Sequence, residues 1–257
     1  MKNIKLGLRQ IIYENKAFRR NPASAFFTFI LPLLFLFILN IILGNNPVES
    51  SKGMINLSTM YIPTMAAFSI INSSYTSIAM NLSISRDRGL LKRIKGTPLP
   101  KSSFLFGKIA HNTLISATLI IIIIIVGELI FDVRVPRNNL PALFIVLLLG
   151  TATFCSLGIA VASLIPNADA SPAIVNASIL PLLFISEVFI PMHNAPSWLN
   201  LIAQIFPVRP LSISLQEIFN PSASGLVIGM IDLLVLCSWL TLGIISSMRY
   251  FSWDPKG

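Results

Sequence analysis

The chain has 257 residues, of which 54% are hydrophobic and only 11% are charged, and its mean hydropathy is +0.78. A soluble domain carries about 25% charged residues, so this composition excludes a soluble fold and predicts a polytopic membrane protein of about six spans. The net charge is +9, but the basic residues gather at the start of the chain and in one loop. There they set topology and meet anionic headgroups, so we expect no nucleic-acid binding.

Residues 1–20 have the pattern of an amphipathic helix that lies on the membrane surface. The alternative is a plain cytoplasmic tail whose charges serve only topology. Asn21 and Pro22 then fit the N-cap and the first-turn proline of the next helix. Apolar side chains recur at helical spacing and cations fill the remaining surface, namely Ile4, Leu8, Ile11, Ile12 and Phe18 against Lys2, Lys5, Arg9, Lys16, Arg19 and Arg20.

Six apolar stretches follow that are long enough to act as transmembrane spans. Their expected bounds are residues 23–43, 57–82, 103–130, 140–165, 173–189 and 224–248. The segment between the first two, GNNPVESSKG, is expected to be a short polar loop on the outside. Six spans place both termini on one side. The leader carries six Lys and Arg and the loop after the second span carries another six, which assigns that side to the cytoplasm. We therefore expect a single transmembrane domain over residues 1–257 in the plasma (inner) membrane.

Polar side chains inside the spans are candidates for a substrate pathway, because such groups normally face protein or water rather than lipid. Ordinary hydrogen bonding between helices explains them equally well, and both readings stay open. The acids Glu187 and Asp232 are costly in a bilayer, so each either pairs with Arg209 or a polar neighbour, or meets a cationic substrate. The pathway candidates are Ser69, Asn72, Ser73 and Thr76 on one face of the second span, and Asn176 and Glu187 in the fifth.

Residues 191–222 are too polar to span a membrane and too apolar for an ordinary loop. Prolines divide this segment into two short pieces. Two half-length amphipathic helices that dip into the outer leaflet fit such a composition. We therefore expect a broken, re-entrant helical segment between the fifth and sixth spans.

The loop at residues 84–108 is the longest basic interruption of the apolar sequence. A family resemblance of this segment implies a short amphipathic helix within residues 84–100, and its apolar side chains can fit a groove on a partner protein while its cations meet acidic partner groups. The alternative is a loop that sets topology and touches headgroups only. The residues expected to contact the partner are Arg86, Arg88, Leu90, Leu91, Lys92, Arg93 and Ile94.

The sequence carries none of the common catalytic motifs. It lacks a GxxxxGK[ST] phosphate loop, an HExxH helix and a GxSxG turn, and its histidines, His111 and His193, lie far apart. Cys155 and Cys237 each sit in an apolar stretch and are interpreted as small buried hydrophobes. We therefore expect that the chain is not an enzyme and holds no metal or cofactor of its own.

Two segments carry a resemblance to a known family. The first runs Arg86-Asp87-Arg88-Gly89, Leu90-Leu91-Lys92-Arg93, Thr97-Pro98-Leu99-Pro100 and Phe106-Gly107-Lys108, and the second runs Phe189-Ile190-Pro191, Ala195-Pro196-Ser197-Trp198-Leu199 and Phe206-Pro207. In this order they resemble the type-2 ABC export permeases, the daunorubicin-resistance and polysaccharide-export group. The chain departs from that pattern at Val208-Arg209-Pro210 and at Glu187, which bears on the substrate rather than on the fold.

The resemblance implies an all-α membrane protein with six transmembrane helices, an N-terminal amphipathic surface helix, a cytoplasmic coupling helix between spans two and three, and the re-entrant segment before span six. It also implies a second permease subunit, expected to be identical, and two copies of a separate ABC ATP-binding subunit that holds ATP and Mg. The expected function is ATP-driven export of an amphiphilic, drug-like compound across the lipid bilayer. Export of a lipid or lipid-linked glycan is the first alternative, and an ion-coupled carrier or channel is the second.

Overall fold

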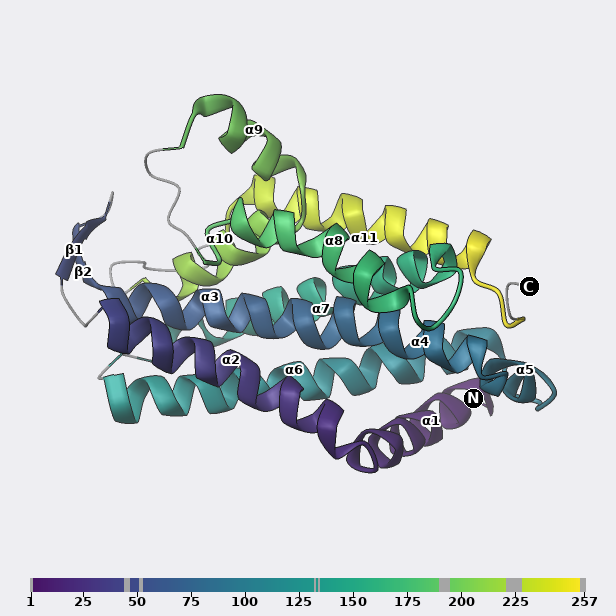
Figure 1. Ribbon diagram of the computed structural model, residues 1–257. Coiled ribbons are helices and arrows are strands. Elements are labelled where there is room, and N and C mark those ends of the chain that lie inside the picture. The colour runs from purple at the N-terminus through teal and green to yellow at the C-terminus, as the bar shows by residue number, and fades with distance from the viewer. Residues whose placement is uncertain are drawn as a thin grey trace.

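Two helices that meet at an elbow begin the chain. In the computed structural model, which describes residues 2–43, 47–50, 53–131, 133, 135–189, 195–220 and 228–254, α1 spans Lys2–Arg19 and α2 spans Pro22–Leu43. Asn21 caps α2, since its side-chain oxygen accepts a hydrogen bond from the Ser24 N–H at 3.2 Å. The helix over the leader and the N-cap of α2 are both as the sequence predicts. Helix α1 packs along α6 (Figure 1).

A short hairpin stands where the sequence predicted an ordinary polar loop. Strand β1 (Pro47–Ser50) pairs antiparallel with β2 (Gly53–Asn56), and Val48 lies opposite Ile55. The hairpin is a local addition to a bundle whose other described elements are helical, so the all-α fold class holds. Strands of four residues are too short for alternation of apolar and polar residues to reveal them.

The second expected span is a continuous helical rod with a local change of winding. Helix α3 (Leu57–Ile71) leads into the π-helical turn η1 (Asn72–Thr76) and then into α4 (Ser77–Asp87). The short helix α5 (Leu90–Lys95) follows at the end of the bundle where both chain termini lie (Figure 1). A short helix within the basic loop is therefore present as predicted.

The remaining helices complete the bundle. They are α6 (Lys101–Phe131), the 3₁₀ turn η2 (Arg137–Asn139), α7 (Leu140–Leu164), α8 (Ser171–Phe184), α9 (Ser197–Ile205), α10 (Val208–Phe219) and α11 (Met230–Tyr250). Pro196 and Pro207 stand at the starts of α9 and α10, so prolines divide the expected re-entrant segment into two short helices. The part of that segment at residues 191–194 and 221–222 lies outside the described residues.

Four helices of the described chain are long and apolar enough to cross a membrane: Pro22–Ile42, Lys101–Phe131, Arg137–Leu164 and Met230–Tyr250. The fifth expected span is represented by α8, which has 14 residues and ends at Phe184 rather than at residue 189. The sixth begins at Met230 in the described chain, and residues 221–227, where it was expected to start, are not described. The count of six spans therefore stays a prediction.

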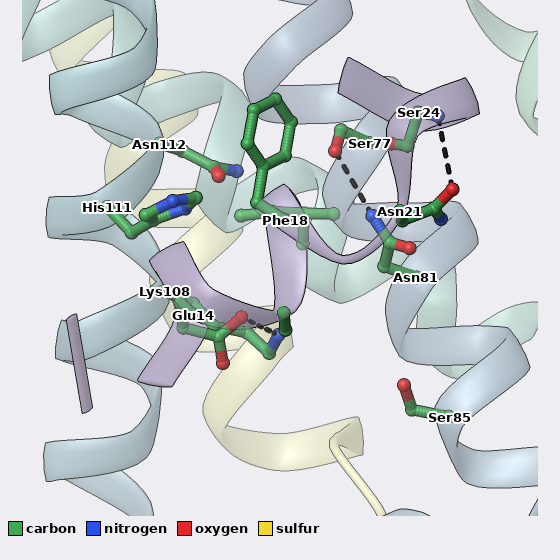
Figure 2. Close-up of a pocket in the computed structure, with 12 residues that line it drawn as sticks. Glu14, Phe18, Asn21, Ser24, Ser77, Asn81, Ser85, Lys108, His111 and Asn112 are labelled. Carbon is green, nitrogen blue, oxygen red and sulfur yellow. Dashed lines mark hydrogen bonds and ion pairs between the residues drawn. The ribbon is translucent and has the colours of Figure 1, made fainter. Parts of the chain in front are cut away.

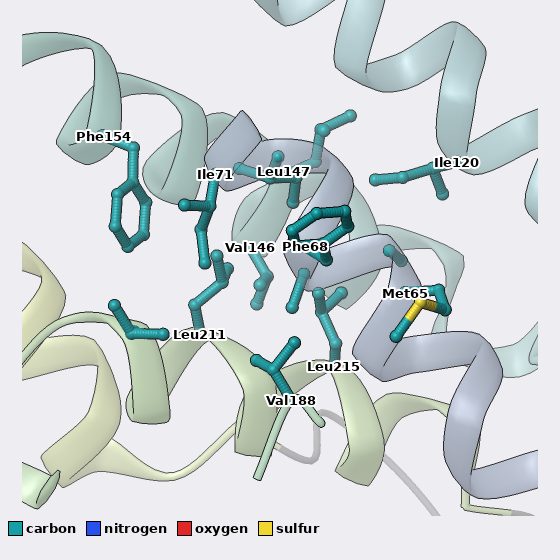
Figure 3. Packing of buried hydrophobic residues seen from close by; sticks show 14 of the residues in the cluster. Met65, Phe68, Ile71, Ile120, Val146, Leu147, Phe154, Val188, Leu211 and Leu215 are labelled. Carbon is teal, nitrogen blue, oxygen red and sulfur yellow. The ribbon is translucent and has the colours of Figure 1, made fainter. Parts of the chain in front are cut away.

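The apolar core lies where α3, α7 and α10 meet (Figure 3). Met65 and Phe68 of α3 and Val146 of α7 are buried there, and α10 adds Leu211 and Leu215. Helix α10 is thus a core element of the described bundle, and its apolar face packs on α3 and α7. This packing fixes the end of the bundle opposite α5.

Candidate functional site

The basic end of the bundle is organised around α5, whose two leucines have opposite environments. Gly89, with φ of +70°, makes the left-handed turn that joins α4 to α5. Leu91 is 2% exposed and packs with Leu82 and Phe104, whereas Leu90 is 44% exposed. The expectation that both leucines enter a partner's groove is therefore wrong for Leu91, which anchors α5 to its own subunit.

Arg86 also points inward, contrary to the expectation that it meets a partner. Its side chain is 3% exposed and donates hydrogen bonds to the backbone carbonyls of Ala162, at 2.8 Å, and of Ile165. These carbonyls belong to the C-terminal end of α7, where backbone acceptors have no helical partner and a cation is favoured. The adjacent Asp87 accepts a hydrogen bond from the Ala168 N–H at 3.1 Å. Arg86 and Asp87 thus fasten the α7–α8 link to α4.

The other cations of the loop remain at the surface. Arg88, Lys92 and Arg93 are exposed, and Ile94 is partly buried against the same cluster as Leu91. Lys95 pairs with Asp254 at 2.7 Å, but both side chains are about half exposed. Such a surface pair contributes only about 0–1 kcal/mol. The structure therefore separates the expected contact set into an inner half that supports α5 and an outer, cationic half.

The C-terminal tail completes this end of the molecule, and the sequence interpretation missed it. The Trp253 ring lies 5.1 Å from the rings of Phe104 and Phe251, measured between centroids. The Lys101 ammonium lies 4.8 Å from the centre of the Phe251 ring and donates to the Phe251 carbonyl at 3.3 Å. The aromatic spacing in the tail RYFSWDPKG was a signal that could have suggested this packing. The tail thus connects α11 to the base of α5 and α6.

The polar face of the second span is largely used inside the bundle. Ser69 and Ser73 are buried, and the Ser73 hydroxyl shares a 2.7 Å hydrogen bond with the Ser116 hydroxyl of α6. Asn112 of α6 donates to the Ser73 carbonyl at 3.0 Å, which satisfies a backbone group of the π-helical turn. These contacts favour interhelical hydrogen bonding as the role of Ser73, whereas the Ser69 hydroxyl donates to the Met65 carbonyl within α3 at 2.7 Å.

The remaining pathway candidates are accessible. Asn72 and Thr76 of η1 are partly exposed, and Asn176 of α8 is exposed. Tyr75 of η1 shares a 2.7 Å hydrogen bond with Ser178 of α8. The π-helical turn therefore bonds to α6 and α8 while leaving some polar side chains at the surface.

Glu187 is paired rather than free. Its carboxylate accepts a hydrogen bond from Arg209 at 3.0 Å, and the two side chains are only 15% and 10% exposed. Arg209 also donates to the Asn200 carbonyl at 2.8 Å. Glu187 has φ of +62°, an uncommon conformation for a residue with a side chain. The ion pair therefore ties the turn after α8 to α9 and α10, which favours the structural reading of Glu187.

A polar cavity of about 140 Å³ lies between the α1–α2 elbow, α4 and α6 (Figure 2). Glu14 of α1 and Lys108 of α6 form an ion pair of 2.9 Å at its edge. Gly107 allows this approach, because a Cβ atom there would clash with the Gln10 side chain of α1. His111 is 6% exposed, and its Nε2 has no hydrogen-bond partner among the described residues. The sequence interpretation did not find this cavity, since its residues come from three separate segments.

No cluster of three or more His, Cys, Asp or Glu that could hold a metal occurs in the described part of the chain. Cys155 is buried as expected, whereas Cys237 is exposed on α11. The described side chains thus offer positioned cations, hydrogen-bonding groups and one polar cavity.

Comparisons with known proteins also point to a transport protein. A family model described as "ABC-2 type transporter" matches residues 10–220. The putative transport permease ycf38 of Porphyra purpurea is 28% identical over 204 residues, which cover 77% of this chain and 67% of that protein. The putative transport permease YvfS of Bacillus subtilis is 24% identical over 199 residues, 77% of this chain and 79% of that protein. The daunorubicin resistance ABC transporter permease protein DrrB1 of Streptomyces coeruleorubidus is 23% identical over 228 residues, 86% of this chain and 76% of that protein.

Proposed function

This chain belongs to the ABC-2 type transporter family, and we propose that it is the transmembrane permease of an ATP-driven exporter of amphiphilic, drug-like molecules. Six spans place both termini in the cytoplasm of cells whose plasma membrane holds the protein. Two copies of the chain form the transport unit above two ATP-binding subunits, which hold ATP and Mg. The drug-resistance permease among the relatives supports this choice of cargo. Export of a lipid or lipid-linked glycan remains the alternative for the same architecture.

The observation that carries the proposal is that α5 is buried on one side and presents exposed cations on the other. An isolated helix of six residues is unstable in water, so the burial of Leu91 is what holds α5 in place. Arg88, Lys92 and Arg93 then stand exposed on a supported base. A fixed cationic surface suits an acidic groove on a partner, because charge complementarity steers assembly and sets its register. We assign this surface to the ATP-binding subunit.

The cargo pathway is proposed to run beside η1 and α8. Asn72, Thr76 and Asn176 supply accessible polar groups there, while Ser69 and Ser73 support the helix from inside. Glu187 is neutralised by Arg209, so no free anion of this pair is available to select cationic cargo. The pathway therefore suits amphiphiles whose polar part is a hydrogen-bonding group.

The test is charge reversal on α5. The double variant Arg88→Glu/Arg93→Glu is co-expressed with the ATP-binding subunit, and vesicles are assayed for vanadate-sensitive, ATP-dependent export. We expect membrane insertion to persist while co-purification and export fall by at least about tenfold, since two attractive contacts become repulsive. Arg137→Glu is the matched control, because Arg137 is an exposed arginine of η2, which precedes α7 at the end opposite to the carbonyls that Arg86 contacts. Normal co-purification and export by the α5 variant would refute the proposed docking surface.

A further inference from the structure

The cavity at the α1–α2 elbow has features of a ligand site that interhelical packing does not explain. His111 places an unpartnered Nε2 in a buried position beside Phe18 (Figure 2). A buried polar group without a partner is costly, and native proteins normally satisfy it. The cavity volume of about 140 Å³ corresponds to roughly four or five waters at about 30 Å³ each. We propose that this cavity binds the headgroup of a zwitterionic phospholipid, as in phosphatidylethanolamine.

The phosphate of such a headgroup matches one side of the cavity. Asn21 and Ser24 line it from the first turn of α2, where the positive end of the helix dipole favours an anion. Lys108 provides an ammonium with three donors, only one of which is used by Glu14. His111 supplies a further ring nitrogen from α6. Side chains from two elements, the start of α2 and α6, thus line one cavity and offer groups that suit a phosphate oxygen.

The ammonium of the headgroup matches Glu14. Each carboxylate oxygen of Glu14 accepts one hydrogen bond, from Gln10 at 2.9 Å and from Lys108 at 2.9 Å. A carboxylate has about four acceptor positions, so two remain for a ligand cation. The charges of Glu14 and Lys108 in the cavity sum to zero, and a headgroup with no net charge keeps the net charge of the site at zero. An anionic lipid would leave the phosphate charge without this partner.

The position of the cavity also suits a lipid of the bilayer. It lies at the junction between an amphipathic helix and an apolar one, which is the depth of headgroups if α1 rests on the membrane surface. Phe26 and Phe27 follow directly on α2 and are 54% and 60% exposed. They provide apolar surface for acyl chains next to the cavity. The proposed orientation of the termini places this lipid in the cytoplasmic leaflet, and the lipid is a resident of the site rather than cargo.

The test measures lipid retention directly. The full-length chain is purified in mild detergent, offered equal amounts of phosphatidylethanolamine and phosphatidylglycerol, and examined by native mass spectrometry. His111→Phe removes Nε2 but keeps a ring against Phe18, and Asn81→Leu fills the mouth of the cavity at an exposed position. Thr118→Val on α6, exposed and outside the cavity, is the matched control. Size-exclusion profiles test whether each variant is folded. If His111→Phe is not folded, Asn81→Leu alone decides the result.

We expect wild type and Thr118→Val to retain phosphatidylethanolamine about tenfold better than phosphatidylglycerol, and the cavity variants to lose that preference. Equal retention of the two lipids by wild type, or unchanged retention by the cavity variants, would overturn the proposal. The Arg88→Glu/Arg93→Glu variant, which is expected to lose export, does not alter a residue that lines the cavity and should retain the lipid normally. A failed docking proposal and a failed lipid proposal are therefore distinguishable.

Discussion

Breaking the ion pair between Glu187 and Arg209 should destabilise the protein far more than it changes cargo selection. The two charges lie 3.0 Å apart and are 15% and 10% exposed, so Glu187→Gln leaves Arg209 with an uncompensated charge in a largely buried site. Removing one partner of a buried pair costs about 3–5 kcal/mol, and because both side chains keep some exposure, we expect a loss of about 3 kcal/mol. For a chain of this size that corresponds to a fall in Tm of roughly 6–12 °C.

The assay is a double-mutant cycle read by thermal unfolding in detergent. Glu187→Gln, Arg209→Met and the double variant are compared, and the interaction free energy is the departure from additivity. Because the double variant leaves no unpaired charge, it should lose about 2 kcal/mol less than the sum of the single variants. Export of cationic and neutral amphiphiles should decline together. An unchanged Tm with selective loss of cationic cargo in Glu187→Gln would refute the structural role and restore the substrate-contact reading.

Three further changes test the supports of the basic end and of η1. Arg86→Ala removes two charge-assisted hydrogen bonds to α7 and should lower the free energy of unfolding by about 3 kcal/mol. Arg88→Ala at the surface is the control and should change the Tm little. Equal Tm values for the two variants would contradict the supporting role of Arg86. Gly158→Ala places a Cβ 2.8 Å from the Tyr75 carbonyl oxygen, so the π-helical turn must shift and we expect a loss of about 1–3 kcal/mol by the same measurement. Trp253→Ala removes two aromatic contacts worth about 0.5–1.5 kcal/mol each and should lower export per ATP hydrolysed while the ATP-binding subunit still co-purifies; coupled export at the wild-type ratio would show that the tail has no part in coupling.

Local chemistry explains why much of the helical framework could be predicted. Long uncharged runs in this composition have only helices available to satisfy their backbone in a bilayer, and α2, α6, α7 and α11 are such runs. Asn21 and Pro22 fix the start of α2, and prolines fix the starts of α9 and α10. These signals act over a few residues, so they can be recognised in the sequence without knowledge of the fold.

The errors concern the direction in which a side chain points. Ile78, Leu82 and Arg86 are spaced four apart on one buried face of α4, so the helical periodicity that identified apolar stripes elsewhere also predicts that Arg86 points inward. Its charge overrode that signal in our interpretation. The packing of the tail on Phe104 and the assembly of the cavity around His111 depend on contacts between separate segments of the chain. A local pattern such as the aromatic spacing of the tail can suggest that a segment packs, but it does not identify the partner.

The inward position of Arg86 changes how a push on α5 can reach the rest of the bundle. Helix α5 is joined to α4 by the single turn at Gly89, and Leu91 packs into the cluster that also contains Ile159 of α7. Arg86 holds the end of α7, and Asp87 holds the link that leads into α8. A displacement of α5 that moves α4 should therefore also move the α7–α8 link, because Arg86 and Asp87 bond α4 to that link. Since α8 carries Asn176 and bonds to Tyr75 of η1, a displacement of α5 can reach the elements proposed to border the pathway through α4 and the α7–α8 link.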